Sequence, residues 1–188
     1  MNTEQFRQRF MLHLPETEQA AAPSSLARQA AVLVPVIDYP QPCLLLTLRA
    51  NHLRHHPGQV AFPGGKVDPT DPTLCHTALR ETQEELAIPT EQIEILGRLP
   101  VVASRTGFAV TPFVGLLPAN VKPRPAPGEV ALSFEVPLLP LLQQDHFLPL
   151  QIKRHGEIQQ IWVCDYQKHF IWGMTAGIIR QLGKQILG

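Results

Sequence analysis

The sequence lacks the features that mark several large classes of protein. Its 188 residues include 16 basic and 16 acidic side chains, so the formal net charge is zero. This balance gives no general attraction to nucleic acid or to an anionic membrane surface. The longest apolar run lies near residues 30–37 and is far too short to span a bilayer. An anionic ligand would therefore have to be held by a local site.

Cysteine is also scarce. Cys43, Cys75 and Cys164 are scattered and form no Cys-x-x-Cys pair, which argues against a disulfide framework and against structural zinc. The first twenty residues carry several charged side chains and no apolar core, unlike a secretory signal. We therefore expect a cytoplasmic protein with packed thiols and with neither a nucleic-acid nor a membrane partner.

The chain does contain enough apolar material for one folded domain. Hydrophobic residues make up 44% of it, and no repeat or long linker divides it. We predict a single domain over residues 1–188, in which residues 1–28 form an N-terminal helix and a linker. Short β-like runs and helical segments predict an α/β/α sandwich with a mixed β-sheet. Trp162, Phe170 and Trp172 are expected in its core rather than stacked on adenine.

The expected elements follow from apolar periodicity and from turn-forming residues. Strands are expected at residues 31–37, 43–49, 60–62, 93–102, 109–117, 147–152 and 158–163, and helices at residues 3–14, 72–86, 138–142 and 175–187.

Charge is concentrated in one short segment, Arg-Glu-Thr-Gln-Glu-Glu at residues 80–85. If this segment is helical, Glu81, Glu84 and Glu85 stand at i, i+3 and i+4 and share one face. A bound Mg²⁺ or Mn²⁺ would offset their repulsion, because these cations prefer carboxylate oxygens and handle phosphate oxygens. A solvated helical face is the plainer alternative.

The residues before this cluster favour the metal interpretation. Gly64 and Gly65 follow a short apolar run, and a glycine loop can approach a ligand closely. A turn-rich stretch then leads into the helix, with Asp71 as a candidate N-cap and Pro72 as the first helical residue. An electrostatic role for Asp71 is the alternative.

The whole segment resembles the signature of the Nudix hydrolases, Gly-x5-Glu-x7-Arg-Glu-U-x-Glu-Glu-x-Gly-U, where U is aliphatic. Gly65, Arg80, the three glutamates and Ile88 match it in order. The sequence departs from the signature at four points: Asp71 replaces the first glutamate, eight residues separate it from Arg80, Thr82 replaces an aliphatic residue, and Ala87 replaces the last glycine.

A second motif narrows the resemblance to the coenzyme A pyrophosphatase branch. Upstream stand Leu-Leu-Thr-Leu-Arg-Ala at residues 45–50, Arg-His-His-Pro-Gly-Gln at 54–59 and Phe-Pro-Gly-Gly at 62–65. This resemblance implies the Nudix fold and metal-dependent hydrolysis of the diphosphate of coenzyme A. The implied products are 4′-phosphopantetheine and adenosine 3′,5′-bisphosphate, and acyl or oxidised coenzyme A could also serve as substrates.

The resemblance also suggests roles for the residues of the signature. Glu81 and Glu85, one helical turn apart, are the first-choice metal ligands. Glu84 is a third ligand and a candidate catalytic group, and the backbone of Gly65 could complete the metal shell. Arg80 would orient a glutamate by hydrogen bonds.

Groups outside the helix complete the predicted site. By resemblance, Glu129 would ligate metal or activate water, and a surface glutamate is its alternative. Residues 49–56 are locally basic, so Arg49 and Arg54 could hold phosphate groups bidentately. His56 and Gly64 are the other expected substrate-binding residues. A zinc site on the three histidines of this segment and a solvated basic loop remain alternatives.

Two competing functions stay open. One is the same chemistry on another nucleoside diphosphate derivative, such as ADP-ribose or NADH, because a fold does not set its substrate. The other is a non-hydrolytic member, either a nucleotide-binding module or an isomerase. The intact glutamates argue against the binding module. The oligomeric state is also open, with a homodimer among the options.

Overall fold

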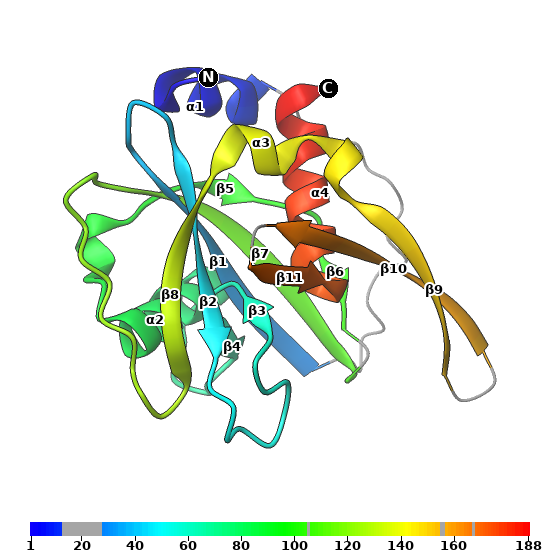
Figure 1. Cartoon of the computed structure of the whole chain (residues 1–188). Coiled ribbons are helices and arrows are strands. Elements are labelled where there is room, and N and C mark those ends of the chain that lie inside the picture. Colours follow the sequence, from blue (N-terminus) through cyan, green and yellow to red (C-terminus); the bar gives the residue numbers. More distant parts are fainter. Residues whose placement is uncertain (13–27, 105, 155–156, 167) are drawn as a thin grey trace.

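The structure, a computed structural model, describes residues 1–12, 28–104, 106–154, 157–166 and 168–188 (Figure 1). Within these residues the main sheet has the strand order β3-β2-β1-β7-β5, with β4 also paired to β1, β6 to β7 and β8 to β2. Its strands are β1 (Arg28–Ile37), β2 (Cys43–Arg49), β3 (Val60–Ala61), β4 (Gly64–Lys66), β5 (Glu94–Arg98), β6 (Val102–Ala103), β7 (Phe108–Leu117) and β8 (Val130–Pro137).

The centre of the main sheet is the parallel pair β1 and β7. They stay in register from Arg28 opposite Phe108 to Ile37 opposite Leu117. β1 is buried from Ala30 onward, as expected for a strand covered on both faces. Because β2 and β4 run antiparallel to β1, the sheet is mixed, as predicted.

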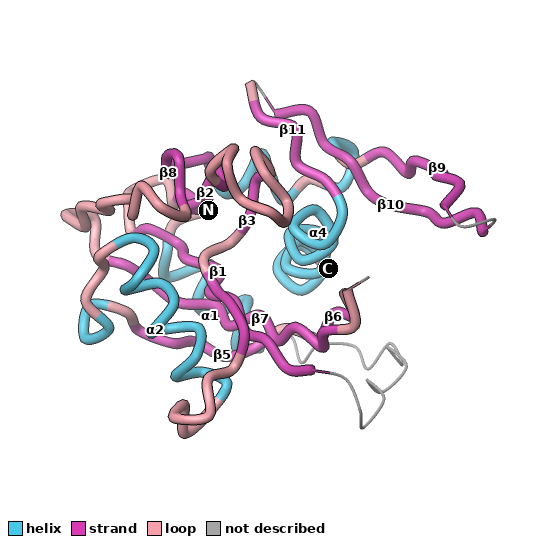
Figure 2. Tube along the Cα trace, turned by 90° about the horizontal axis from the view of Figure 1, so that it is seen from below, coloured by secondary structure: helices cyan, strands magenta, loops and turns pink. Residues whose placement is uncertain are grey.

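Helices cover both faces of this sheet. Figure 2 places α2 (Leu74–Leu86) on one side of β1, β7 and β5 and α4 (Gly173–Leu187) on the other. Alternate residues of β1 point to opposite faces and enter two separate cores. Ala31, Leu33 and Ile37 pack with Ala78 and Leu86 of α2, whereas Val32, Val34 and Val36 share a core with Ile178, Ile179 and Leu182 of α4. The predicted α/β/α sandwich is confirmed.

Two shorter helices complete the layer that contains α4. The first is α1 (Thr3–Leu12), which lies beside the C-terminal end of α4, and the second is α3 (Leu138–Leu142) (Figure 1). Two short 3₁₀ turns, Thr90–Gln92 and Gln144–His146, lie in connections. No described helix has the length and apolar character needed to cross a membrane.

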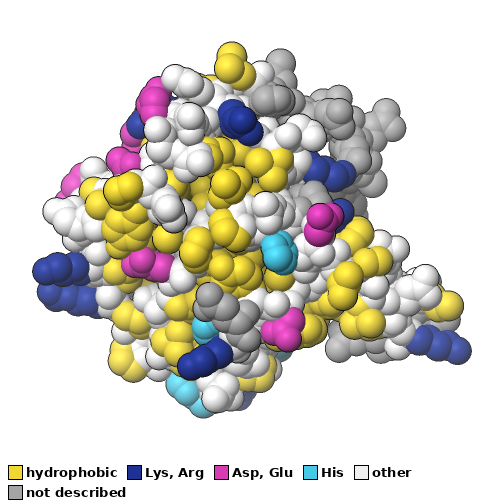
Figure 3. Space-filling model, turned by 45° about the horizontal axis from the view of Figure 1, so that its top comes forward, with side chains coloured by type: hydrophobic (Ala, Val, Ile, Leu, Met, Phe, Trp, Pro, Cys, Tyr) yellow, Lys and Arg dark blue, Asp and Glu magenta, His cyan; other side chains and the backbone are white. Residues whose placement is uncertain are grey.

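A second, three-stranded sheet was not foreseen from the sequence. It has the order β11-β10-β9, built from β9 (Leu148–Arg154), β10 (Glu157–Tyr166) and β11 (His169–Trp172), and it packs against α4. The strands predicted at residues 147–152 and 158–163 are confirmed as β9 and β10, which form an antiparallel hairpin. It extends from the body and carries exposed apolar side chains (Figures 1 and 3), with Leu148 and Ile158 among them.

The structure describes a single chain, so the homodimer that the sequence left among the options stays a prediction.

Two of the three expectations about aromatic residues in the core were wrong. Phe170 is 52% exposed and Trp172 is only half-buried, whereas Trp162 is half-buried but packs against the core. All three belong to the second sheet. Because this sheet covers α4 rather than extending the main sheet, its large side chains meet the edge of the body and solvent.

Several predicted boundaries also shift. The helix expected at residues 72–86 begins at Leu74, with Thr73 as its N-cap: the Thr73 hydroxyl accepts a hydrogen bond from the His76 amide at 3.1 Å. The prediction of Asp71 as the cap was therefore wrong. The strand expected at 93–102 divides into β5 and β6. Residues 13–27, which include the end of the predicted N-terminal helix and the predicted linker, lie outside the described residues, as do residues 155–156.

Candidate active site

Two glycines let the signature helix approach the sheet. Gly64 and Gly65 of β4 pair with Val32 and Ala31 of β1. Gly64 has a φ of +152°, and a Cβ there would collide with the backbone of β1. A Cβ on Gly65 would collide with the carboxylate of Glu81. Glycine at both positions therefore allows a carboxylate of α2 to press directly against the backbone of β4.

Glu85 and Glu81 form a pair of shielded carboxyl groups on that face. Glu85 is only 3% exposed, and its Oε2 accepts a hydrogen bond from the Gly64 amide at 3.3 Å. Burial raises the pKa of Glu85 to about 8, and the nearby charge of Glu81 adds to this effect. Burial also raises the pKa of Glu81. The two charges are thus costly to hold together without a cation.

Arg80 joins several acidic groups through one guanidinium. Its Nη1 donates to Glu84 Oε2 at 3.0 Å and its Nη2 to Glu81 Oε1 at 3.0 Å. The Nε and Nη2 atoms also donate to the two oxygens of Asp71, at 3.0 and 3.1 Å. These bonds hold the two glutamate side chains in defined positions.

Asp71 anchors this network instead of capping the helix. Its side chain is closed off from solvent. Besides the fork of Arg80, it accepts hydrogen bonds from Thr77 Oγ1 at 2.8 Å and from the Asp68 amide at 3.0 Å, and it lies 3.0 Å from His76 Nδ1. The bonds from Arg80 hold the pKa of the Asp71 carboxyl well below its usual range. In the sequence, the only signal for this role was its match to the acidic position of the signature.

Glu129 reaches the same region from a distant part of the chain. The loop before it lies over the end of α2, where the Ala126 amide donates to the Glu85 carbonyl at 2.8 Å. The Glu129 carbonyl in turn accepts a hydrogen bond from the Ala50 amide at 2.9 Å. Its exposed side chain is close enough for its charge to help raise the pKa values of Glu81 and Glu85.

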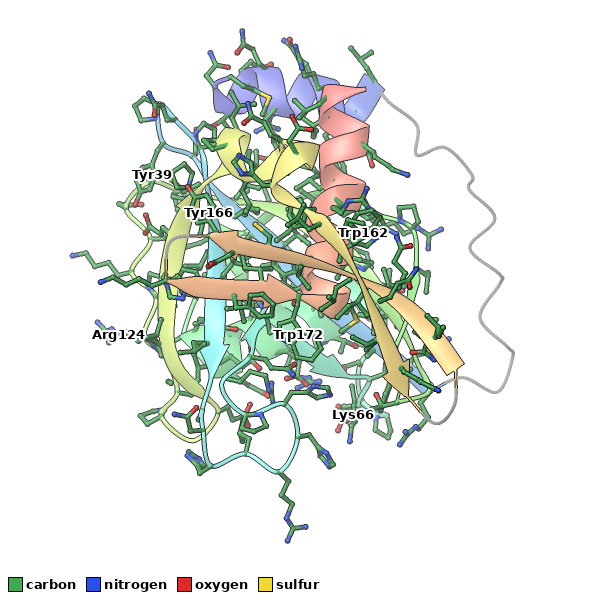
Figure 4. The ribbon with its side chains drawn as sticks, turned by 45° about the vertical axis from the view of Figure 1, so that its right-hand side comes forward. Tyr39, Lys66, Arg124, Trp162, Tyr166 and Trp172 are labelled. Atoms are coloured by element: carbon green, nitrogen blue, oxygen red, sulfur yellow. The ribbon has the colours of Figure 1, made fainter. Side chains whose placement is uncertain are left out.

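A cavity of about 720 Å³ opens beside these carboxyl groups. Arg49, His56 and Gly64 are among its lining residues, and so are Trp162 and Trp172 of the second sheet. In Figure 4, Trp162 and Trp172 both extend from the second sheet. Sequence reasoning missed this wall, because strands that far apart in the chain carry no local sign of meeting.

Arg49 is a second cation near the buried pair, besides Arg80. Its charge favours the ionised form of Glu85. Its Nε is shielded from solvent and has no hydrogen-bond acceptor among the described residues. A shielded guanidinium nitrogen without an acceptor is free to bind an anionic group entering the cavity.

The remaining basic residues are more dispersed than the sequence suggested. Arg54 lies on an exposed loop and is not among the described residues that line the cavity. His56 Nδ1 is 2.8 Å from Gln59 Oε1, and His52 Nε2 is 3.1 Å from the Gly128 carbonyl. Within the described part of the chain, no three histidine, cysteine or acidic side chains converge as a preformed metal site, so the zinc alternative gains no support.

The donors near the buried pair nevertheless fit a hard divalent cation. Glu81 and Glu85 supply carboxylate oxygens, and the Gly65 backbone lies against Glu81. Glu84 would have to leave Arg80 Nη1, to which it is now bonded, in order to join them. A cation at this position would offset the repulsion between two shielded charges, and carboxylate oxygen is the ligand that Mg²⁺ and Mn²⁺ prefer.

The comparison with known families agrees with this geometry. A family model of the NUDIX domain matches residues 27–163. The chain belongs to the Nudix family. As a Nudix hydrolase it falls into a family that typically uses divalent metals and acts on small nucleotide-type molecules. The four departures from the signature therefore do not exclude the chain from the family.

Two relatives extend the match over nearly the whole chain. A protein of Klebsiella pneumoniae (strain 342), described as an uncharacterized Nudix hydrolase NudL, is 51% identical over 186 residues, covering 99% of this chain and 95% of that protein. A NudL of Salmonella paratyphi B is 49% identical with the same coverage. This Nudix hydrolase is therefore similar to NudL proteins.

Solved structures support the fold at lower identity. A Nudix hydrolase from Alicyclobacillus acidocaldarius superposes with a TM-score of 0.55 and 20% identity, covering 84% of this chain and 91% of that one. The NUDIX domain of Shewanella oneidensis NrtR, complexed with ADP ribose, gives a TM-score of 0.51 and 23% identity, covering 69% and 88%. At these identities the likeness concerns the fold alone.

Proposed function

We propose that this Nudix hydrolase splits the diphosphate bond of coenzyme A, and of acyl or oxidised coenzyme A, using water and Mg²⁺ or Mn²⁺. One observation carries the proposal: the upstream motif lines a cavity that adjoins the signature helix. Arg49, His56, Gln59 and Gly64 of the upstream motif line this cavity, and the Gly64 amide donates to Glu85 of the signature. The residues that resemble the coenzyme A pyrophosphatase branch thus lie at the buried carboxyl pair.

The acidic residues supply the metal site. Glu81 and Glu85, with Glu84 and the Gly65 backbone, would hold a divalent ion that neutralises the diphosphate and lowers the pKa of a bound water. Arg80 keeps Glu81 oriented through its hydrogen bond, whereas Glu84 joins the ion by leaving Arg80 Nη1. This arrangement leaves the ligand oxygens aimed from one helix face at the space beside β4.

Two further side chains take part in the reaction: one binds the diphosphate, and the other accepts the proton of the attacking water. Arg49, whose Nε has no acceptor among the described residues, donates to a diphosphate oxygen. The proton of the attacking water goes to the exposed carboxylate of Glu129, with Glu84 as the alternative acceptor. Both carboxylates lie near the ligand pair and have the chemistry of a general base.

The 3′-phosphate of coenzyme A, which lies apart from the diphosphate, suggests a role for Arg54. Arg54 lies on the same loop as His56, which lines the cavity. An exposed arginine beside the cavity can pair with a 3′-phosphate without desolvating it fully. We therefore assign Arg54 to the 3′-phosphate, while Arg49 contacts the diphosphate.

A hydrolysis panel tests the proposal. Coenzyme A, dephospho-coenzyme A, ADP-ribose and NADH are compared by kcat/KM, each with and without Mg²⁺ or Mn²⁺. We expect metal-dependent cleavage with coenzyme A preferred over dephospho-coenzyme A by about tenfold, near 1.4 kcal/mol for one charged contact. A clear preference for ADP-ribose or NADH would instead support the alternative of another nucleoside diphosphate derivative.

A further inference from the structure

The side of the cavity that comes from the second sheet, β6 and the start of α4 carries no charged side chain among the described residues and is partly aromatic. It includes Trp162 of β10, Trp172 of β11, Met174 of α4 and Val102 of β6, along with uncharged polar side chains such as Gln159 and Gln160. None of these residues belongs to either sequence motif. Such a wall favours an uncharged group, because an anion placed there would lose water without gaining a charged partner.

Trp162 is held rigidly in this wall. The guanidinium of Arg180, on α4, lies 3.3 Å from the centre of its ring, so that one face of the indole is already covered. Nearby, the Thr175 hydroxyl donates to the Val60 carbonyl at 3.0 Å and ties α4 to β3. The second sheet, α4 and β3 therefore form one fixed surface, suited to recognise an extended substrate.

The two halves of coenzyme A differ in charge. The adenosine half carries a 3′-phosphate close to its ring, so burying adenine against the tryptophans would carry this charged group toward the apolar wall. The pantetheine half is an uncharged chain. Among the described residues of the lining, Arg49 is the one permanently charged side chain, and it lies next to Glu85, where the diphosphate would be cleaved.

From this contrast we infer that the cavity binds the uncharged pantetheine arm of the substrate, with Trp172 and Met174 as the residues that determine specificity for it. The inference rests on the proposed function. It orients the substrate: the diphosphate lies at Arg49, the arm extends along the tryptophan wall, and the nucleotide with its 3′-phosphate points out toward the loop of Arg54. The ligand class selected by the wall is an uncharged, flexible amide-containing arm.

The two reaction products allow each half to be tested separately. Binding of 4′-phosphopantetheine and of adenosine 3′,5′-bisphosphate is measured by calorimetry with wild type, Trp172→Ala and Trp172→Phe. We expect Trp172→Ala to weaken binding of 4′-phosphopantetheine about tenfold, as for loss of a large apolar contact. Binding of adenosine 3′,5′-bisphosphate should stay within about twofold of wild type, and Trp172→Phe should restore most of the loss.

Phe170 provides a matched control. It lies on the same strand, two residues before Trp172, but is 52% exposed and outside the described lining. Phe170→Ala should leave both products bound as in wild type. If Trp172→Ala does not fold, Met174→Ala serves as the second variant: Met174 lines the cavity and is 38% exposed, so its truncation should cost little stability.

Tryptophan fluorescence gives an independent reading. The chain has two tryptophans, and both line the cavity, so emission should change with 4′-phosphopantetheine and not with adenosine 3′,5′-bisphosphate. Selective weakening of adenosine 3′,5′-bisphosphate by Trp172→Ala, or no effect on either product, would overturn the orientation. Failure of the wild type to cleave coenzyme A would instead overturn the proposed function.

Discussion

The two walls of the cavity are built in opposite ways. The proposed catalytic wall meets the cavity at Gly64 and comes mainly from residues 64–85, with Arg49 and Glu129 added from outside this stretch. It is held by charged hydrogen bonds from Arg80 to Asp71, Glu81 and Glu84. The opposite wall draws on segments far apart in the chain, including β6, β10 and the start of α4, and is mainly apolar. In the proposed function, chemistry depends on hydrogen bonds within one short segment, whereas substrate recognition depends on packing between segments far apart in the chain. Substitutions can separate the two.

The largest effect should follow from removing one charge on the catalytic wall. Glu85→Gln is close in shape, and its amide oxygen can still accept from the Gly64 amide, yet it lacks the charge needed by a metal ion. We expect kcat/KM to fall about a hundredfold or more. Glu91→Gln, an exposed glutamate in a 3₁₀ turn, is the matched control. Near-wild-type turnover of Glu85→Gln at saturating metal would show that the carboxyl pair is not the metal site.

A smaller loss of activity should follow from a substitution at Asp71, which accepts two hydrogen bonds from Arg80. Asp71→Asn keeps the size of the side chain but removes the charge that pairs with the guanidinium fork. We expect kcat to fall about tenfold with little change in KM, as for loss of a group that orients a ligand. Asp68→Asn is the control, because Asp68 Oδ1 bonds only locally, to Thr70. An equal loss in both variants would assign the effect to the loop as a whole.

Removing the Glu85 charge should also stabilise the metal-free fold at alkaline pH. Its native pKa of about 8 lies above the ordinary value of 4.5, so the native state binds more protons than the unfolded state between these values. Unfolding free energy should therefore fall as pH rises from 4.5 to 8. The metal-free Glu85→Gln variant does not lose unfolding free energy in this way, because glutamine does not ionise. At pH 8 its unfolding free energy should exceed that of wild type by on the order of 1 kcal/mol or more.

Thermal melts with a chelator, at pH 5 and pH 8, measure this difference. The gap between variant and wild type should be several times smaller at pH 5 than at pH 8. Saturating Mg²⁺ should stabilise wild type and not the variant, since the cation offsets the buried charge only where the charge exists. A gap that does not depend on pH would mean that packing, not ionisation, separates the two proteins.

The smallest effect concerns the end of the catalytic helix. Ala87, where the signature has glycine, adopts a left-handed conformation with φ of 53°. Because glycine accepts this conformation without steric cost, Ala87→Gly should stabilise the fold by about 0.5–1 kcal/mol and leave hydrolysis unchanged. Ala78→Gly, inside the same helix, should act in the opposite direction by about 1 kcal/mol or more. Chemical denaturation curves give both values.

The local sequence was enough to predict the carboxylate face of α2, because the residues that form it lie within two helical turns of one another. Helical periodicity alone puts Glu81, Glu84 and Glu85 on one face, and the glycine pair before them matches the close approach of β4. The β-like runs and helical segments likewise predicted the α/β/α sandwich, and the continuous burial of β1 from Ala30 onward agrees with a strand covered on both faces. The motifs also sufficed to indicate the family.

Tertiary structure decided the burial and the partners of these groups. The pKa of Glu85 depends on its depth and on charges from other segments, and Asp71 changed from a supposed cap to an anchor once Thr73 took the capping position. Trp162 and Trp172 became cavity walls only because the second sheet packs on α4 instead of extending the main sheet. Contacts between distant segments depend on the packing of the whole chain, which no local period in the sequence encodes.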